Sequence, residues 1–250
     1  MRFEGSDDVM RYIQHRIGSD MDNNGINILI TGFGPFREHV VNASWQCVAR
    51  IPEKGITVPS NINPDTPINL ILYEIPVVYK SVARIVPQLW AKHSPDLVIH
   101  VGVSGIAKAI TIEQAAHNCG YSSTDIVDSI PDGNVCVVDG CDVMESGFEM
   151  RDVVNRINCT GSGVHAELSY DPGRYLCDFI YYQSLNINKD RTAFIHVPPL
   201  GKPWSAEEMT DAIRICITEL LYQLQERKAL SLSTSSRSSN ESFNLEQNRL

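Results

Sequence analysis

The sequence has no long hydrophobic run, no excess of positive charge and few aromatic residues. Its longest nearly continuous apolar run, residues 97–101, is far shorter than the roughly 20 residues that a membrane-spanning helix needs. Twenty-one Lys and Arg stand against thirty Asp and Glu, and the formal charge of -9 opposes binding to nucleic acid or to an anionic membrane. The composition, 43% hydrophobic, 20% charged and 8% aromatic, is that of an ordinary globular protein. We therefore expect a soluble protein that binds neither nucleic acid nor membrane.

The sequence also lacks the features of a secreted protein or a metal protein. Residues 1–24 contain four aspartates and no uninterrupted apolar stretch, which is unlike a signal peptide and predicts a cytoplasmic location. Seven cysteines, an odd number spread along the chain, favour reduced thiols over a disulfide framework. Cys136 and Cys141 have a spacing that zinc would accept, but no second Cys or His pair follows, so we predict no metal. The Gly32–Gly34 turn lacks the third glycine of a dinucleotide fingerprint, so we predict no cofactor.

Segments with strand patterns alternate with segments of helical periodicity. Strands are predicted at 26–31, 70–75, 96–103 and 193–197, with a weaker candidate at 109–115. Helices are predicted at 43–50, around 82–90, at 145–157, from 173 onward, and after the capping box at 205–208. Residues 52–67 read as a polar surface connection and 119–142 as a long irregular loop. The alternation predicts an α/β fold, a single-domain three-layer sandwich whose mixed, centrally parallel sheet is flanked by helices.

Cys177 is the first candidate for chemistry. It follows Asp171 and Pro172, a helix cap and a favoured first helical residue, so we expect it within the first two turns of a helix. The positive end of a helix stabilises a thiolate, which is the nucleophilic form of cysteine. The alternative is a buried structural cysteine, because free cysteines are among the most buried residues.

His196 and Glu113 are candidates to assist such a nucleophile. His196 lies in an otherwise apolar strand just before the rigid turn at 198–201, and functional groups of α/β sheets gather at strand ends. Glu113 is a charged residue inside a predicted strand, where a carboxylate without a partner would be costly and an imidazole would serve as one. A hydrogen-bonded core histidine and an outward-facing surface glutamate remain the alternatives.

Five stretches of the sequence resemble the pyroglutamyl-peptidase I family of cysteine peptidases, family C15, and are close to its animal members. They occur in the family's order within residues 26–227, and they are 31–36 (TGFGPF), 40–45 (VVNASW), 100–105 (HVGVSG), 173–179 (GRYLCDF) and 196–203 (HVPPLGKP). The resemblance implies a thiol protease that removes an N-terminal pyroglutamyl residue from peptides through a covalent acyl-enzyme. It also implies that Cys177 is the nucleophile, His196 the base and Glu113 the carboxylate that orients the base.

The substrate group sets the expected character of its pocket. Pyroglutamyl is a small neutral lactam, which suits a largely apolar pocket with a few placed hydrogen bonds. The resemblance implies that Phe33 and Phe36 form walls of this pocket and that Asn42 helps to shape it. A core aromatic pair and a helix cap are the alternatives for these residues.

The chain departs from the family pattern in two respects. No counterpart is found for an arginine that contributes to the oxyanion hole of bacterial members, so backbone N–H groups at the start of the Cys177 helix are the expected donors. The chain also carries added segments, and we divide it into an N-terminal extension (1–25), a catalytic domain (26–228) and a Ser-rich tail (229–250) predicted to be disordered. Whether it is a monomer or a homo-oligomer stays open.

Two other functions compete with this one. The first is a related thiol hydrolase or deamidase that acts on another small amide with the same three residues. The second is a non-catalytic binding protein that kept the fold, against which the presence of Cys177, His196 and Glu113 argues.

Overall fold

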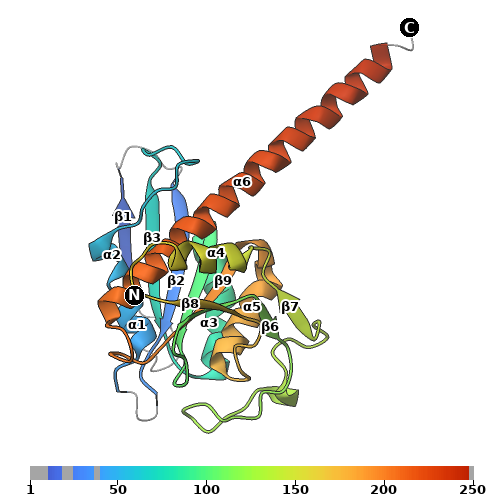
Figure 1. Cartoon of the computed structure of the whole chain (residues 1–250). Helices are drawn as coiled ribbons and strands as arrows, with labels where there is room; N and C mark the ends of the chain where they lie inside the picture. Colours follow the sequence, from blue (N-terminus) through green and yellow to red (C-terminus); the bar gives the residue numbers. More distant parts are fainter. Residues whose placement is uncertain (1–10, 19–24, 37–39, 248–250) are drawn as a thin grey trace.

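Seven strands form one mixed sheet through the middle of the molecule. The computed structural model describes residues 11–18, 25–36 and 40–247 (Figure 1). The strand order is β1-β3-β2-β4-β9-β5-β8, and the four neighbours from β3 to β9 are mutually parallel. These four are β3 (Ile68–Ile75), β2 (Ile26–Phe33), β4 (Leu97–Val103) and β9 (Thr192–Val197). The predicted mixed sheet with a parallel centre is therefore confirmed.

The edges of the sheet make it mixed. β5 (Ile110–Glu113) runs antiparallel to β9, and β8 (Ala166–Ser169) pairs parallel with β5. On the other side, β1 (Tyr12–Ile17) adds an antiparallel edge strand next to β3. β1 comes from the segment described above only as an N-terminal extension, and the rest of that extension, 1–10 and 19–24, lies outside the described residues.

Helices cover both faces of the sheet because its strands are apolar on both sides. In β2, Ile28 and Ile30 join the core on one face and Leu29 joins the core on the other. The first core lies under α1 (Ala43–Val48), α4 (Met150–Asn158) and α6 (Ala206–Gln247), with the short α2 (Ile51–Lys54) at its border. The second lies under α3 (Tyr79–His93) and α5 (Leu176–Asn188), which completes the predicted three layers.

The region after β5 contains a second, two-stranded sheet. β6 (Ala115–His117) pairs antiparallel with β7 (Val143–Glu145). The loop between them holds the short 3-10 turn η1 (Asp132–Asn134) and one isolated bridge between Cys119 and Val135. The helix predicted from residue 145 starts instead at Met150, because Glu145 is paired with Ala115. Pro87 is accommodated inside α3, which continues to His93.

The C-terminal helix is longer than predicted. Its capping box is present, with the Glu208 N–H donating to Ser205 Oγ at 3.2 Å and the Ser205 N–H donating to Glu208 Oε2 at 2.8 Å. The helix then continues to Gln247. The division of the chain that ends in a disordered, Ser-rich tail at 229–250 stays a prediction. No Gly or Pro follows Pro203 in the sequence, so no helix breaker ends α6 earlier. Figure 1 shows its last turns projecting away from the sheet and its flanking helices.

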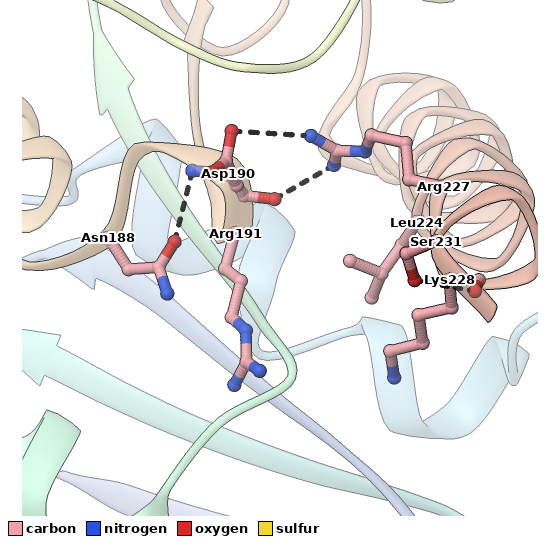
Figure 2. Close-up of a pocket in the computed structure, with 7 residues that line it drawn as sticks. All are labelled: Asn188, Asp190, Arg191, Leu224, Arg227, Lys228 and Ser231. Atoms are coloured by element: carbon pink, nitrogen blue, oxygen red, sulfur yellow. Dashed lines mark hydrogen bonds and ion pairs between the residues drawn. The ribbon is translucent and has the colours of Figure 1, made fainter. Parts of the chain in front are cut away.

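Where α6 leaves the body of the protein, it is held by basic side chains. Arg227 Nη2 donates to the Asp190 carbonyl at 2.8 Å in the 3-10 turn η2 (Lys189–Arg191), and its guanidinium stacks 4.3 Å from the centre of the Phe148 ring. Lys228 Nζ pairs with Asp96 at 3.2 Å. A groove of about 420 Å³ lies between η2 and α6. Figure 2 shows Arg227 reaching across to Asp190.

Candidate active site

Cys177 lies in the first turn of α5, which begins at Leu176 with Tyr175 as its N-cap residue. The prediction that Asp171 caps this helix is wrong. Gly173 has a φ of 75°, which turns the chain away from helical geometry before α5 begins. Asp171 Oδ1 instead accepts hydrogen bonds from the Gly173 N–H at 3.0 Å and from Arg174 at 2.6 Å. The predicted position of Cys177 at a helix start is nevertheless confirmed.

The start of α5 is suited to hold negative charge. The N-cap residue makes no side-chain capping hydrogen bond, so the first backbone N–H groups of the helix are not occupied by a cap. These groups, together with the helix dipole, favour an anion at this end of the helix. Both a thiolate on Cys177 and an oxyanion formed next to it would benefit.

Gly102 of β4 provides the space in which Cys177 meets His196. A Cβ atom at Gly102 would lie 2.6 Å from Cys177 Sγ, 2.8 Å from Phe194 Cζ and 3.4 Å from His196 Cδ2. The two functional side chains therefore lie against the same glycine. The sequence contains this glycine in the stretch 100–105, but its role depends on a contact between β4 and α5 that sequence patterns do not reveal.

Glu113 and His196 meet because β5 and β9 are antiparallel neighbours. Glu113 is opposite Phe194 in the register, and residues two apart on a strand share a face, so His196 is the diagonal neighbour of Glu113. Glu113 Oε1 and His196 Nδ1 are 2.8 Å apart, and both side chains are almost completely buried. Glu113 is thus paired inside the protein, and the alternative of a surface glutamate is excluded.

The charge state of His196 follows from its neighbours. Burial alone lowers its pKa, but interactions with Cys177 and hydrogen bonding to Cys177 and Glu113 outweigh burial and raise the pKa to about 10. Because Nδ1 is engaged by Glu113, Nε2 is the ring nitrogen left to face the sulfur. The arrangement favours the imidazolium form of His196 next to the Cys177 sulfur.

A small pocket of about 40 Å³ opens next to Cys177. Its lining includes Cys177 and the three residues predicted from the sequence, Phe33, Phe36 and Asn42. Four further lining residues were not predicted from the sequence: Val77, Val103, Tyr175 and Leu176. The lining is almost entirely apolar, as expected for a small neutral group.

Asn42 fills the capping role that the sequence left open. Its Oδ1 accepts from the Ser44 N–H at 3.0 Å, which caps α1, and its Nδ2 donates to the Gly34 carbonyl at 2.9 Å. Asn42 thereby fixes the end of β2, with Phe33, and the following loop, with Phe36, while it lines the pocket. The role of Phe33, Phe36 and Asn42 in substrate binding stays a prediction.

Other kinds of site find little support in the described part of the chain. All seven cysteines are free thiols. Within residues 11–18, 25–36 and 40–247, no group of three or more His, Cys, Asp or Glu side chains is arranged to hold a metal ion. In the same ranges, no helix combines the length and the apolar character needed to cross a membrane.

A cysteine at a helix start, next to an imidazole that is held by a carboxylate, is the arrangement of a cysteine hydrolase. Comparison with known proteins narrows this class: a family model described as pyroglutamyl peptidase matches residues 26–224. The chain belongs to the pyroglutamyl peptidase family, and it is a cysteine peptidase of family C15. The resemblance stated from the five sequence stretches is confirmed.

Individual relatives agree with this assignment. Pyroglutamyl-peptidase 1 of Rattus norvegicus is 45% identical over 199 residues, which cover 80% of this chain and 91% of the rat protein. The Homo sapiens pyroglutamyl-peptidase 1-like protein is 41% identical over 164 residues, covering 66% of this chain and 83% of that protein.

Solved structures of more distant proteins share the fold. The pyrrolidone carboxyl peptidase of Thermococcus litoralis has a TM-score of 0.69 at 22% identity, covering 81% of this chain and 96% of that one. Pyroglutamyl peptidase I of Bacillus amyloliquefaciens has a TM-score of 0.67 at 24% identity, covering 79% and 97%. The predicted fold class is therefore confirmed by structures as well as by the sheet topology.

Proposed function

We propose that this chain hydrolyses the bond after an N-terminal pyroglutamyl residue of peptides, with Cys177 as nucleophile, His196 as acid and base, and Glu113 as the carboxylate that orients the imidazole. The observation that carries the proposal is the 2.8 Å bond between Glu113 and His196, made beside the sulfur of Cys177. Membership of the pyroglutamyl peptidase family supplies the substrate class.

In the first half of the reaction, Cys177 becomes acylated. The thiolate sulfur attacks the carbonyl carbon of the pyroglutamyl residue, and the carbonyl electron pair moves onto oxygen. The His196 imidazolium then donates its proton to the departing amine nitrogen as the C–N bond breaks. The products of this step are the shortened peptide and a thioester between the pyroglutamyl group and Cys177.

In the second half, water regenerates the thiol. Neutral His196 accepts a proton from water, the hydroxide attacks the thioester carbon, and the C–S bond breaks to return the electron pair to sulfur. Free pyroglutamate leaves and the imidazolium is restored. Glu113 stabilises that imidazolium in both halves through its bond to Nδ1.

The oxyanion of both tetrahedral states needs hydrogen-bond donors. We propose the backbone N–H groups at the start of α5, which no side-chain cap occupies. They belong to the same turn as Cys177, so an oxygen on the attacked carbon would form within their reach. This assignment replaces the arginine for which the sequence has no counterpart.

The pocket beside Cys177 explains a preference for pyroglutamyl over an ordinary N-terminal residue. Phe33, Phe36 and Val77 offer an apolar lining, and an ordinary N-terminus would have to bury a charged amine there. A lactam carries no charge and loses little on leaving water. Selectivity thus comes mainly from the cost that the pocket places on charged competitors.

The proposal is tested with a panel of fluorogenic amides that differ only in the acyl group. We expect cleavage of the pyroglutamyl amide and none of the alanyl or glutamyl amide, and complete loss of turnover in Cys177→Ala, whose small side chain leaves the helix intact. Preferential cleavage of another acyl group would favour the thiol hydrolase or deamidase alternative. Undiminished activity in Cys177→Ala would disprove the nucleophile.

The family match and the contacts of α6 set the bounds of the catalytic domain. We propose that residues 26–228 form the catalytic domain, since the family model covers 26–224 and the bonds of Arg227 and Lys228 to the body end close to residue 228. We propose a cytosolic location, because all seven cysteines are free thiols, which suits a reducing compartment.

A further inference from the structure

Asp178 is a fully buried carboxylate directly after Cys177. It occupies the third position of α5, where an acidic side chain usually turns back to the N–H of the cap residue. Asp178 instead reaches another element, because its Oδ1 accepts a hydrogen bond from the backbone N–H of His117 at 2.9 Å. The carboxylate therefore connects the nucleophile's helix to a different part of the active site.

His117 ends the segment that holds Glu113. β5 ends at Glu113 and β6 follows at once, ending at His117. The His117 carbonyl accepts a hydrogen bond from the buried Tyr121 hydroxyl, and the Glu113 carbonyl accepts one from Tyr181 at 2.9 Å. The backbone from Glu113 to His117 is thus held by hydrogen bonds at both ends, so the His117 N–H that Asp178 binds has a fixed position.

The second oxygen of Asp178 is also used. Oδ2 accepts from Arg174 Nη1 at 3.2 Å, and the same guanidinium pairs with the exposed Asp171 at 2.6 Å. Burial raises the pKa of Asp178 to about 7, although the His117 N–H and Arg174 both act to lower it. A buried carboxylate is costly, and both of its oxygens bond to protein groups while it stays outside the lining of the substrate pocket.

We propose that Asp178 is a positioning residue: its hydrogen bond to the His117 backbone holds the start of α5 so that Cys177 faces His196 and Glu113. Cys177, Glu113 and His196 come from α5, β5 and β9, and this bond ties α5 to β6, the strand that follows β5. The inference rests on the proposed function, because it concerns the alignment of the same three residues. Misplacement of a reacting group by about 1 Å can cost on the order of 100-fold in rate.

The test measures kcat and KM for a fluorogenic pyroglutamyl amide. Asp178→Ala removes the bond and should lower kcat by roughly 100-fold with KM within about twofold of wild type. Asp178→Asn keeps an oxygen that can accept from the His117 N–H, so its kcat should fall by only about tenfold. Asp171→Asn is the matched control, since it removes an exposed carboxylate from the same Arg174, and its kcat should equal that of wild type.

A second background separates positioning from a loss of fold stability. In Glu113→Gln, where the alignment of the imidazole is already impaired, Asp178→Ala should cost only a few-fold more in kcat. The inference would be overturned if Asp178→Ala lowered kcat by the same factor in both backgrounds, or if its kcat stayed within about threefold of wild type. If Asp178→Ala does not fold by circular dichroism, Asp178→Leu decides, because it fills the space but cannot accept from the His117 N–H: wild-type kcat overturns the inference, and a loss of roughly 100-fold at constant KM supports it.

The activities of Cys177→Ala and Asp178→Ala distinguish a failure of the proposed function from a failure of the positioning role. Activity retained in Cys177→Ala would disprove the proposed function whatever Asp178 does. An inactive Cys177→Ala together with a fully active Asp178→Ala would disprove only the positioning role.

Discussion

At the scale of single residues, Gly102 matters because its missing side chain leaves room for Cys177 and Phe194. Adding one methyl group there would place a carbon 2.6 Å from Cys177 Sγ and 2.8 Å from Phe194 Cζ. Gly102→Ala should therefore push the sulfur away from His196 and lower kcat/KM at least 100-fold, with a loss of about 1–3 kcal/mol in the free energy of unfolding from overpacking. Amide hydrolysis and urea unfolding measure the two effects.

Gly105 on the following loop is the matched control for Gly102. A Cβ there would meet nothing within 4 Å, and its φ is not positive. Gly105→Ala should keep wild-type kcat/KM and stability. Equal losses in both variants would show that the space at Gly102 is not what matters.

Glu113 is one of the two neighbours, after Cys177, that raise the pKa of His196. The folded-state pKa of His196, about 10, lies above its ordinary value near 6.5, so the stabilisation from its proton is complete below about pH 6.5 and is lost as the pH rises through about 10. We expect kcat/KM of the wild type to decline on the alkaline side near pH 10. Glu113→Gln should lower kcat/KM by on the order of 10²-fold and move that decline to lower pH. A pH profile whose alkaline limb is the same in both proteins would contradict the assignment of Glu113.

At the scale of elements, His100 connects two strands to a helix. In β4, its Nδ1 lies 2.7 Å from Thr31 Oγ1 of β2, and its Nε2 lies 2.7 Å from Ser184 Oγ of α5. The ring is completely buried, and burial lowers its pKa to about 3. The folded protein therefore holds the ring neutral, whereas the unfolded chain takes up a proton below about pH 6.5.

That difference predicts a specific loss of stability in acid. The contribution of neutral His100 is complete above about pH 6.5 and is lost as the pH falls toward 3, at up to about 1.4 kcal/mol per pH unit. His100→Gln should be less stable at pH 7.5 by roughly 1–3 kcal/mol, because one buried partner is left unsatisfied, but its stability should fall less steeply with acid. Urea unfolding of both proteins at pH 7.5, 6 and 5 measures this, and parallel curves would rule out His100 as the group responsible.

At the scale of the whole molecule, α6 has a packed part and a projecting part. Leu224 is buried, Arg227 stacks on Phe148, and Lys228 pairs with Asp96, beyond which Figure 1 shows the helix leaving the body. Truncation after Ser231 should keep kcat and change Tm by no more than about 2 °C. Truncation after Gln223 should lower Tm by roughly 5–10 °C, because it removes about 2–3 kcal/mol of packing and hydrogen bonding. Thermal unfolding and activity assays on the two truncated proteins measure these effects. A large loss of Tm in the protein truncated after Ser231 would show that the projecting part of α6 stabilises the fold.

Much of this architecture could be predicted because its signals are local. The central strands are continuous apolar runs, and α6 begins with a capping box. Both patterns involve residues that are close together in the sequence, so the positions of these elements could be predicted from it. β1 and β8 escaped prediction because Tyr12–Ile17 and Ala166–Ser169 are short and carry little apolar pattern of their own. Each becomes a strand because its neighbour in the sheet, β3 for β1 and β5 for β8, offers it hydrogen bonds.

The active site divides in the same way. The sequence alone selected the candidates for chemistry. Cys177 and His196 lie in stretches that carry the family's pattern, and Glu113 is a charged residue inside a predicted strand. Only the tertiary structure decided that Glu113 and His196, 83 residues apart, share a 2.8 Å bond. It also decided that Gly102 must leave room for the sulfur and that Asp178 bonds to the His117 backbone. The physical reason is that such contacts depend on strand register and helix placement, which pack residues together regardless of their separation along the chain.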